Sequence, residues 1–190
     1  MLQTPIKTLS LAEFLQLRET KPAREYIDGQ IVPKPMPQGD RSTIQVELTE
    51  AINAVAKKQK IARAYTELRC TIGEWAIVPD IAVFAWERIP VDDEGNVANT
   101  FSIAPDWIIE ILSPGQNSIR VTGKILHALE YGSQMGWLID PETRSVLISP
   151  PKQQPQLLQK ETDSLPVPAL VSDLHLTVGD LFGWLQYRKL

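Results

Sequence analysis

The sequence predicts an α/β protein in which a mixed β-sheet is flanked by helices. Short apolar segments rich in β-branched residues alternate with longer segments that are expected to be helical. The expected order, αββ-α-βββ-α-ββ-β-α, is typical of helices packed against a sheet. A chain of 190 residues can bury a sizeable core, and it contains no internal repeat or domain linker. We therefore expect a single domain over residues 1–190.

The N-terminal part predicts a short helix, a hairpin and one long helix. Ser10 and Glu13 form a capping-box pattern, so a helix is expected to begin at Ser10. Two short strands are expected on either side of an Asp-Gly turn at 28–29. A proline-rich loop follows at 33–39. Apolar residues at helical spacing in 40–60 then predict an amphipathic helix of about five turns.

The central part predicts further strands and a second helix. Strands are expected at 62–72, 76–85 and 107–112, with an acidic surface loop at 90–96. A helix is expected from Asn117 to Tyr131, with Gly132 as its C-terminal cap.

The last part of the chain predicts mainly strands. Two paired strands are expected at 135–140 and 144–149. A weaker strand signal lies near Leu157, and a final helix is expected from Thr177 through Leu185.

Two carboxylates within the apolar segments are the most informative residues. Asp80 lies in the segment 76–84, and Glu110 lies in the segment 105–112 with apolar neighbours on both faces of the predicted strand. An ionised carboxylate in a buried strand is costly unless a cation or matched donors meet it. Taken alone, Asp80 is explained as an acid that accepts backbone N–H groups. Two acids placed in this way indicate one shared divalent metal.

The composition restricts the kind of metal and the compartment. Two histidines and the single Cys70 argue against a structural zinc site, so oxygen ligands and a hard ion such as Mg²⁺ or Mn²⁺ are expected. One cysteine cannot form an intrachain disulfide, and Met1–Lys7 lacks an export-signal pattern, so we expect a cytoplasmic protein. No apolar run approaches the roughly 20 residues of a membrane span, so no membrane partner is expected.

The charge of the chain argues weakly against nonspecific nucleic-acid binding. The formal net charge is −4 and the pI is about 5.3. One local basic cluster contains Lys57, Lys58, Lys60 and Arg63. It is interpreted mainly as the solvated end of a helix, although a local patch can matter more than the total charge.

Five segments carry a resemblance to a known family through their order and spacing. These segments are Glu25–Gln30, Val78–Val83, Pro105–Pro114, Lys124 on the second long helix, and Gly136–Pro141. Together they resemble the Uma2 family, a branch of the PD-(D/E)XK nuclease superfamily. The resemblance covers about Ser10 to Leu185, nearly the whole chain.

The resemblance implies a restriction-endonuclease-like core and a Mg²⁺-dependent DNA endonuclease, a hydrolase of phosphodiester bonds. Asp80 and Glu110 would be the ligands of Mg²⁺ or Mn²⁺. The superfamily usually carries a Lys two residues after the second acid, where this chain has Leu112. The resemblance implies that Lys124, from the next helix, takes that role, so that Asp80, Glu110 and Lys124 form the catalytic set.

The chemistry agrees with this set. Phosphodiester hydrolysis needs a metal that polarises the phosphoryl oxygen and acidifies a bound water. It also needs a cation that stabilises the charge of the transition state. Cleavage of both strands of a duplex by one type of active site usually requires two copies, so a homodimer acting on DNA is expected.

Departures from the family pattern leave an alternative open. Family members usually carry a His at the start of the first long helix, where this chain has Arg41 or Ser42, and Tyr residues where Ala128 and Gly136 stand. The segment 118–123 also lacks the acid that is common before the Lys. These changes surround the helix that carries Lys124. The alternative is a catalytically weak or inactive nuclease-fold protein that binds nucleic acid or a protein partner.

Two further acids have no assigned role at this stage. Glu25 matches the family pattern. Glu47 lies near the apolar face of the first long helix and is interpreted mainly as a surface residue.

Overall fold

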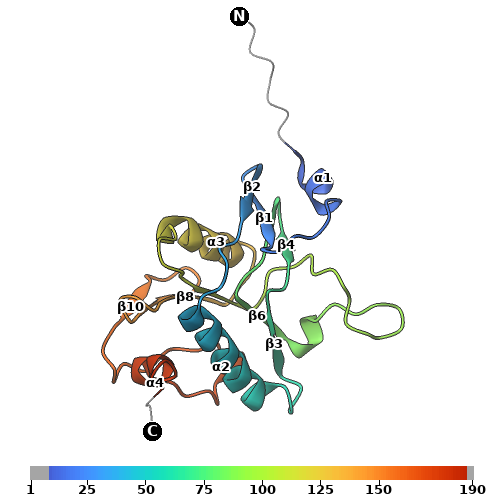
Figure 1. The fold of residues 1–190 in the computed structure, drawn as a ribbon. Coiled ribbons are helices and arrows are strands. Elements are labelled where there is room, and N and C mark those ends of the chain that lie inside the picture. Colours follow the sequence, from blue (N-terminus) through green and yellow to red (C-terminus); the bar gives the residue numbers. More distant parts are fainter. Residues whose placement is uncertain (1–8, 188–190) are drawn as a thin grey trace, which may run out of the picture.

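The computed structural model describes residues 9–187, and the strands of this part form two sheets (Figure 1). The segment Met1–Lys7, in which no export signal was found, lies outside the described residues. The larger, six-stranded sheet has the following order across its width: β10 (Gln156–Leu158), β9 (Ser145–Ser149), β8 (Met135–Asp140), β7 (Trp107–Ile111), β6 (Ile81–Ala85) and β3 (Ala62–Thr66).

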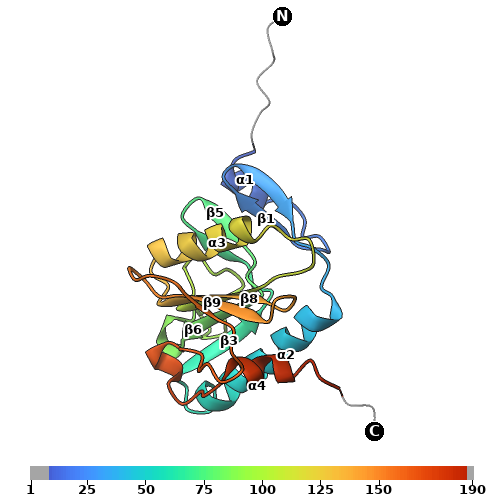
Figure 2. The same cartoon turned by 90° about the vertical axis from the view of Figure 1, so that its left-hand side faces the viewer.

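The larger sheet is mixed and has helices on both faces, as the sequence predicts. β7 and β8 are parallel, whereas the other neighbouring strands are antiparallel. A parallel pair needs a crossover, and α3 (Ser118–Glu130) provides it. α3 covers one face of the sheet. The other face packs against α2 (Gly39–Ala56) and α4 (Val178–Gly183) (Figure 2).

The smaller sheet lies on the same side as α3. Its antiparallel strands are, in order, β2 (Gln30–Pro33), β1 (Arg24–Ile27), β5 (Trp75–Ile77) and β4 (Cys70–Ile72). Side chains of this sheet, such as Ile27 and Ile77, share a core cluster with Val121 and Ile125 of α3. The smaller sheet and α3 are therefore packed against one another and against the larger sheet.

Two predicted strands are each divided between the two sheets. The predicted strand 62–72 forms β3 and β4, and the predicted strand 76–85 forms β5 and β6. Glu67 has a φ of 51° and interrupts the first segment, and Pro79, which has no N–H donor, interrupts the second. The second, smaller sheet was therefore not predicted, because both halves of each segment are apolar and read as one continuous strand.

The helix ends are close to those predicted. α1 (Leu11–Leu15) begins after the capping box of Ser10, as expected. α2 ends at Ala56 and not at residue 60, and α4 ends at Gly183 and not at Leu185. Two short 3₁₀ helices, η1 (Trp86–Arg88) and η2 (Ala169–Val171), complete the described helical elements. None of the helices in the described part is long and apolar enough to cross a membrane.

Candidate functional site

Asp80 and Glu110 lie next to each other on neighbouring strands of the larger sheet. Asp80 immediately precedes β6, and Glu110 is in β7. In the antiparallel register Ile81 is opposite Ile109, so the next step along the two chains brings Asp80 beside Glu110. The N–H of Ile111 donates to Asp80 Oδ2 at 2.7 Å. Both acids are 1% exposed, so the interior holds two carboxylates together.

Asp80 is met by two cations from the segment around the start of α2. Lys34 Nζ lies 2.8 Å from Asp80 Oδ1, and the guanidinium of Arg41 donates to the same oxygen. Lys34 is 5% exposed and Arg41 is 3% exposed. Although burial alone would raise the pKa of Asp80, the charges of Lys34 and Arg41 lower it below its ordinary value. Asp80 is therefore held ionised.

Glu110 shares the ammonium of Lys124 with a third carboxylate. Lys124 Nζ lies 2.8 Å from Glu110 Oε1 and 2.8 Å from Glu25 Oε1. Glu25 comes from β1 of the smaller sheet and also accepts the N–H of Val78 at 2.8 Å. Lys124 is buried on α3, although it would be a solvated helix residue by its sequence position alone. Its ammonium contacts Glu110, one member of the acid pair.

The charges around Glu110 and Lys124 are strongly coupled. Burial raises the pKa of Glu110 to about 7, Lys124 opposes this effect, and the neighbouring Asp80 adds to it. Burial would lower the pKa of Lys124, but the Glu110 and Glu25 carboxylates raise it above its ordinary value. Lys124 is therefore a fixed cation, whereas burial keeps the pKa of Glu110 above its ordinary value.

Two polar side chains complete the cluster. Gln45 of α2 donates to the carbonyl oxygen of Asp80 at 2.7 Å and to Glu67 Oε1 at 3.2 Å. Glu67 lies between β3 and β4 and also pairs with Lys34 at 3.1 Å. If all groups are ionised, the carboxylates Glu25, Glu67, Asp80 and Glu110 exceed the cations Lys34, Arg41 and Lys124 by one negative charge.

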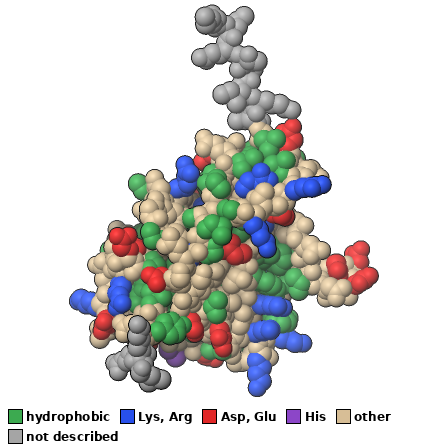
Figure 3. All heavy atoms as spheres, in the orientation of Figure 1, with side chains coloured by type: hydrophobic (Ala, Val, Ile, Leu, Met, Phe, Trp, Pro, Cys, Tyr) green, Lys and Arg blue, Asp and Glu red, His purple; other side chains and the backbone are tan. Residues whose placement is uncertain are grey.

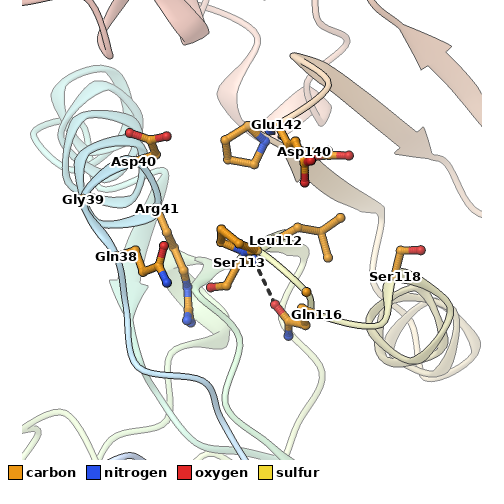
Figure 4. Close-up of a pocket in the computed structure, with 13 residues that line it drawn as sticks. Gln38, Gly39, Asp40, Arg41, Leu112, Ser113, Gln116, Ser118, Asp140 and Glu142 are labelled. Atoms are coloured by element: carbon orange, nitrogen blue, oxygen red, sulfur yellow. Dashed lines mark hydrogen bonds between the residues drawn. The ribbon is translucent and has the colours of Figure 1, made fainter.

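A cavity of about 540 Å³ opens beside this cluster (Figure 4). Its wall is formed by the first turn of α2, the loop after β7, the start of α3 and the turn between β8 and β9. Arg41 lines the cavity and also reaches Asp80, so it joins the cavity to the acid pair. Leu112 lines the cavity two residues after Glu110. The volume lies in the range of small-ligand sites.

The two acids are chemically suited to a hard divalent ion. Within residues 9–187, no three His, Cys, Asp or Glu side chains form a metal-holding group. Mg²⁺, however, is usually held by one or two carboxylates and keeps several waters. Burial raises the pKa of Glu110, and a bound cation would favour its ionised form. Asp80 and Glu110 therefore fit such an ion, but at Asp80 the ion has to compete with Lys34 and Arg41.

The basic cluster of Lys57, Lys58, Lys60 and Arg63 is remote from this site. Arg41 is in the first turn of α2 and Lys57 directly follows the last residue of this helix, which separates them by about 24 Å along the helix axis. Figure 3 shows Lys and Arg side chains gathered in this part of the surface, at the lower right. The cluster is therefore a solvated helix end and does not line the cavity.

Sequence analysis missed several residues that hold the acids. Lys34 is in a proline-rich loop and carries no sequence signal of burial. Arg41 was noted only as a departure from the family pattern. Glu25 was noted through the family pattern without a role, and Gln45, not Glu47, turns toward Asp80. The contacts of Lys34, Arg41 and Gln45 with Asp80 span 35–46 positions of the chain, so they depend on the complete fold.

Comparisons with known proteins agree with the family pattern. The family model described as "Uma2: Putative restriction endonuclease" matches residues 11–179. A crystal structure described as a "putative nuclease belonging to DUF820" from Anabaena variabilis ATCC 29413 is similar over 93% of this chain and 99% of its own, with 54% identity and a TM-score of 0.92. A search of curated proteins found no match. The family match extends from α1 to the start of α4, and on this ground the chain belongs to the Uma2 family.

Proposed function

We propose that this protein is a metal-dependent nuclease that hydrolyses phosphodiester bonds in DNA. The observation that carries the proposal is the convergence of Asp80, Glu110 and Lys124 in one buried cluster beside a cavity. The description of the family and that of the similar Anabaena structure both name a nuclease, which supports the same chemistry.

In this proposal Asp80 and Glu110 hold one Mg²⁺ or Mn²⁺ through carboxylate oxygens. When bound, such an ion polarises the phosphoryl oxygen and lowers the pKa of a bound water. Lys124 keeps its ammonium beside Glu110, where it stabilises negative charge that develops on the phosphate. Glu25 positions Lys124 from the opposite side. The buried setting strengthens each of these electrostatic interactions.

The proposal is tested by incubating the purified protein with supercoiled plasmid and Mg²⁺ or Mn²⁺. We expect nicked or linear DNA, no cleavage in the presence of a chelator, and no cleavage by Asp80→Asn. Asp93→Asn, in the exposed loop between β6 and β7, is a matched control for the loss of one carboxylate and should retain cleavage. Equal cleavage by wild type and Asp80→Asn would reject this site.

A second candidate function is favoured by one observation. Lys34 and Arg41 neutralise Asp80 without any metal, as expected of a nuclease fold that has become a binding module. Such a protein would bind nucleic acid or a protein partner and leave plasmid intact. DNA binding measured by fluorescence anisotropy, without cleavage over the same range of protein and metal concentrations, would select this function.

Two further expectations belong to the same proposal. Cleavage of both strands of a duplex would use a homodimer, which sedimentation analysis of the purified protein tests. A cytoplasmic location is supported by the single cysteine, Cys70, which is buried and whose pKa is raised by burial to about 12. Localisation of a tagged protein tests it.

A further inference from the structure

Arg41 is placed to act on both the acid pair and the cavity. Its guanidinium pairs with Asp80 Oδ1, while the residue lines the cavity from the first turn of α2. Figure 4 shows the Arg41 side chain extending from that turn past Ser113. A movement of this one side chain would therefore change the charge at Asp80.

Arg41 is held less completely than Lys34, the other cation on Asp80. An ammonium has three N–H donors, and Lys34 Nζ has partners for all of them: Asp80 at 2.8 Å, the Val78 carbonyl at 2.7 Å and Glu67 at 3.1 Å. Apart from Asp80, Arg41 has longer contacts, with the Pro35 carbonyl at 3.2 Å and Glu67 at 3.5 Å. Its Nε is buried and has no hydrogen-bond partner among the described residues. Of the two cations, Arg41 is the one that can leave Asp80 at lower cost.

The cavity offers a place to which the guanidinium can turn. The Gln38 side chain makes no capping bond at the start of α2, so the positive end of an 18-residue helix faces the cavity without a side-chain cap. Ser113 is 6% exposed and its hydroxyl has no hydrogen-bond partner among the described residues. Arg41 Nε and the Ser113 hydroxyl are both buried at the edge of the cavity, so a turn of the Arg41 side chain toward the cavity would free these two unpartnered groups for an anion.

Two of the three acids of the cavity, Asp140 and Glu142, lie across it from the start of α2. Figure 4 shows Asp140 and Glu142 at the β8–β9 turn, away from Ser113 and the Arg41 side chain, whereas Asp40 lies on the same first turn of α2 as Arg41 and points away from the end of the Arg41 side chain. Asp140 is also engaged within its own turn, where it accepts the N–H of Glu142 at 3.0 Å. An anion is therefore expected on the side formed by Gln38, Arg41 and Ser113.

We propose that Arg41 competes with the divalent ion for Asp80, and that a phosphate group of the nucleic acid, bound in the cavity, removes this competition by drawing the guanidinium away. The proposal rests on the proposed nuclease function and adds the order in which its site is assembled. Lys34 and Arg41 together occupy Asp80 Oδ1 and repel a metal ion that approaches it. A guanidinium binds phosphate oxygens in a bidentate manner. Substrate and metal therefore bind with positive coupling.

The test measures the affinity of Mn²⁺ by electron paramagnetic resonance of the free ion, without nucleic acid. Arg41→Gln should bind Mn²⁺ more tightly than wild type, by roughly 5-fold to 100-fold, the range of a typical coupling. The control is Lys57→Gln, which also removes one positive charge. Lys57 is exposed and directly follows the last residue of the same helix. The Mn²⁺ affinity of this variant should equal that of wild type. Arg41→Lys keeps a cation and should lie between wild type and Arg41→Gln.

A second measurement tests the cavity with inorganic sulfate, a tetrahedral anion that the enzyme cannot hydrolyse. Sulfate should tighten the binding of Mn²⁺ to wild type and to Lys57→Gln, and it should have no effect on Arg41→Gln. Arg41→Gln is expected to fold, because Asp80 keeps Lys34 and the Ile111 N–H as partners. Circular dichroism during thermal unfolding checks that the variant is folded. If Arg41→Gln is unfolded, the Mn²⁺ affinity of Arg41→Lys is compared with that of wild type instead.

The outcomes separate this proposal from the proposed function. Equal Mn²⁺ affinity in wild type and Arg41→Gln, in a protein that cleaves plasmid, overturns the competition and leaves the nuclease function standing. If Arg41→Gln binds Mn²⁺ more tightly than wild type but sulfate does not change the Mn²⁺ affinity of wild type, the role of the cavity is overturned. A failure of every variant to bind Mn²⁺, together with intact plasmid, overturns both proposals.

Discussion

The side chain of Asp80 is tied to the backbone of Ile111, whose N–H donates to Asp80 Oδ2 at 2.7 Å. Ile111 directly follows Glu110, so this bond holds the first acid beside the second through the sheet itself. No metal is needed to bring the two carboxylates together, because the strand register and this hydrogen bond already hold them side by side.

Removal of Asp80 should affect both stability and metal binding. Asp80→Ala leaves Lys34 and Arg41 buried without their shared carboxylate, and the loss of one member of a buried ion pair typically costs about 3–5 kcal/mol. The variant should therefore melt at a lower temperature than wild type without metal. Mn²⁺ should raise the melting temperature of wild type and leave that of Asp80→Ala unchanged, because the ion stabilises only a protein that binds it. A metal-induced shift of equal size in both proteins would contradict this prediction, which differential scanning fluorimetry checks.

Removal of Lys124 should reduce cleavage more than metal binding. Lys124→Ala removes a cation that is expected to stabilise the phosphoryl transition state, so cleavage should fall by roughly 10²–10³-fold. Mn²⁺ should still bind, because a protonated Lys is a donor and no ligand. Lys124→Arg keeps the charge but changes its shape, so only partial rescue is expected. Single-turnover cleavage and Mn²⁺ titration of the same samples check these points, and undiminished cleavage by Lys124→Ala would remove Lys124 from the mechanism.

The raised pKa of Glu110 predicts a particular pH dependence of the metal-free protein. Burial raises this pKa from its ordinary 4.5 to about 7, so between these values the folded protein binds more protons than the unfolded chain. The free energy of unfolding contributed by Glu110 therefore falls as the pH rises from about 4.5 to 7, and it is constant above that range. Glu110→Gln cannot ionise and should lack this slope.

Urea unfolding of both proteins at pH 5, 6, 7 and 8 measures the effect. The stability of wild type relative to Glu110→Gln should fall by roughly 2–3 kcal/mol between pH 5 and 8. A constant difference would show that Glu110 titrates at the same pH in the folded and unfolded states.

The contact between Gly136 and Ile125 predicts a steric effect that reaches Lys124. A Cβ atom at position 136 would lie 2.1 Å from Ile125 Cγ2, so β8 and α3 can only approach this closely with Gly on the strand. Gly136→Ala should destabilise the protein by about 1–3 kcal/mol, the usual cost of overpacking. Because Ile125 follows Lys124 directly, the displacement should also reduce cleavage.

The matched partner for this change is Ile125→Leu, which removes the methyl group on Cβ. The double variant should recover part of the stability lost in Gly136→Ala, and a double-mutant cycle of melting temperatures measures the recovery. Additive effects of the two substitutions would contradict a direct clash.

The sequence predicts the acid pair because each acid lies within a short apolar segment, and such a segment indicates a buried strand. Asp80 and Glu110 stand out within apolar runs, and Lys124 was found through the family pattern. Lys34 and Arg41 could not be found in this way, because their burial follows from contacts with residues about 40 positions away. The division of the predicted strands between two sheets was missed for a related reason. An interruption such as that at Pro79 leaves the hydrophobic pattern almost unchanged, yet it moves the chain from one sheet to the other.

Two backbone amides of the site provide spectroscopic reporters of its charge. The N–H of Val78 donates to Glu25, and the N–H of Ile111 donates to Asp80. The chemical shift of an amide proton responds to the charge of its acceptor. In a two-dimensional NMR spectrum these two signals would follow the two sides of the cluster separately. Titrations with protons, metal ions or nucleic acid would then reveal the order in which Asp80 and Glu25 change their partners, without any substitution in the site.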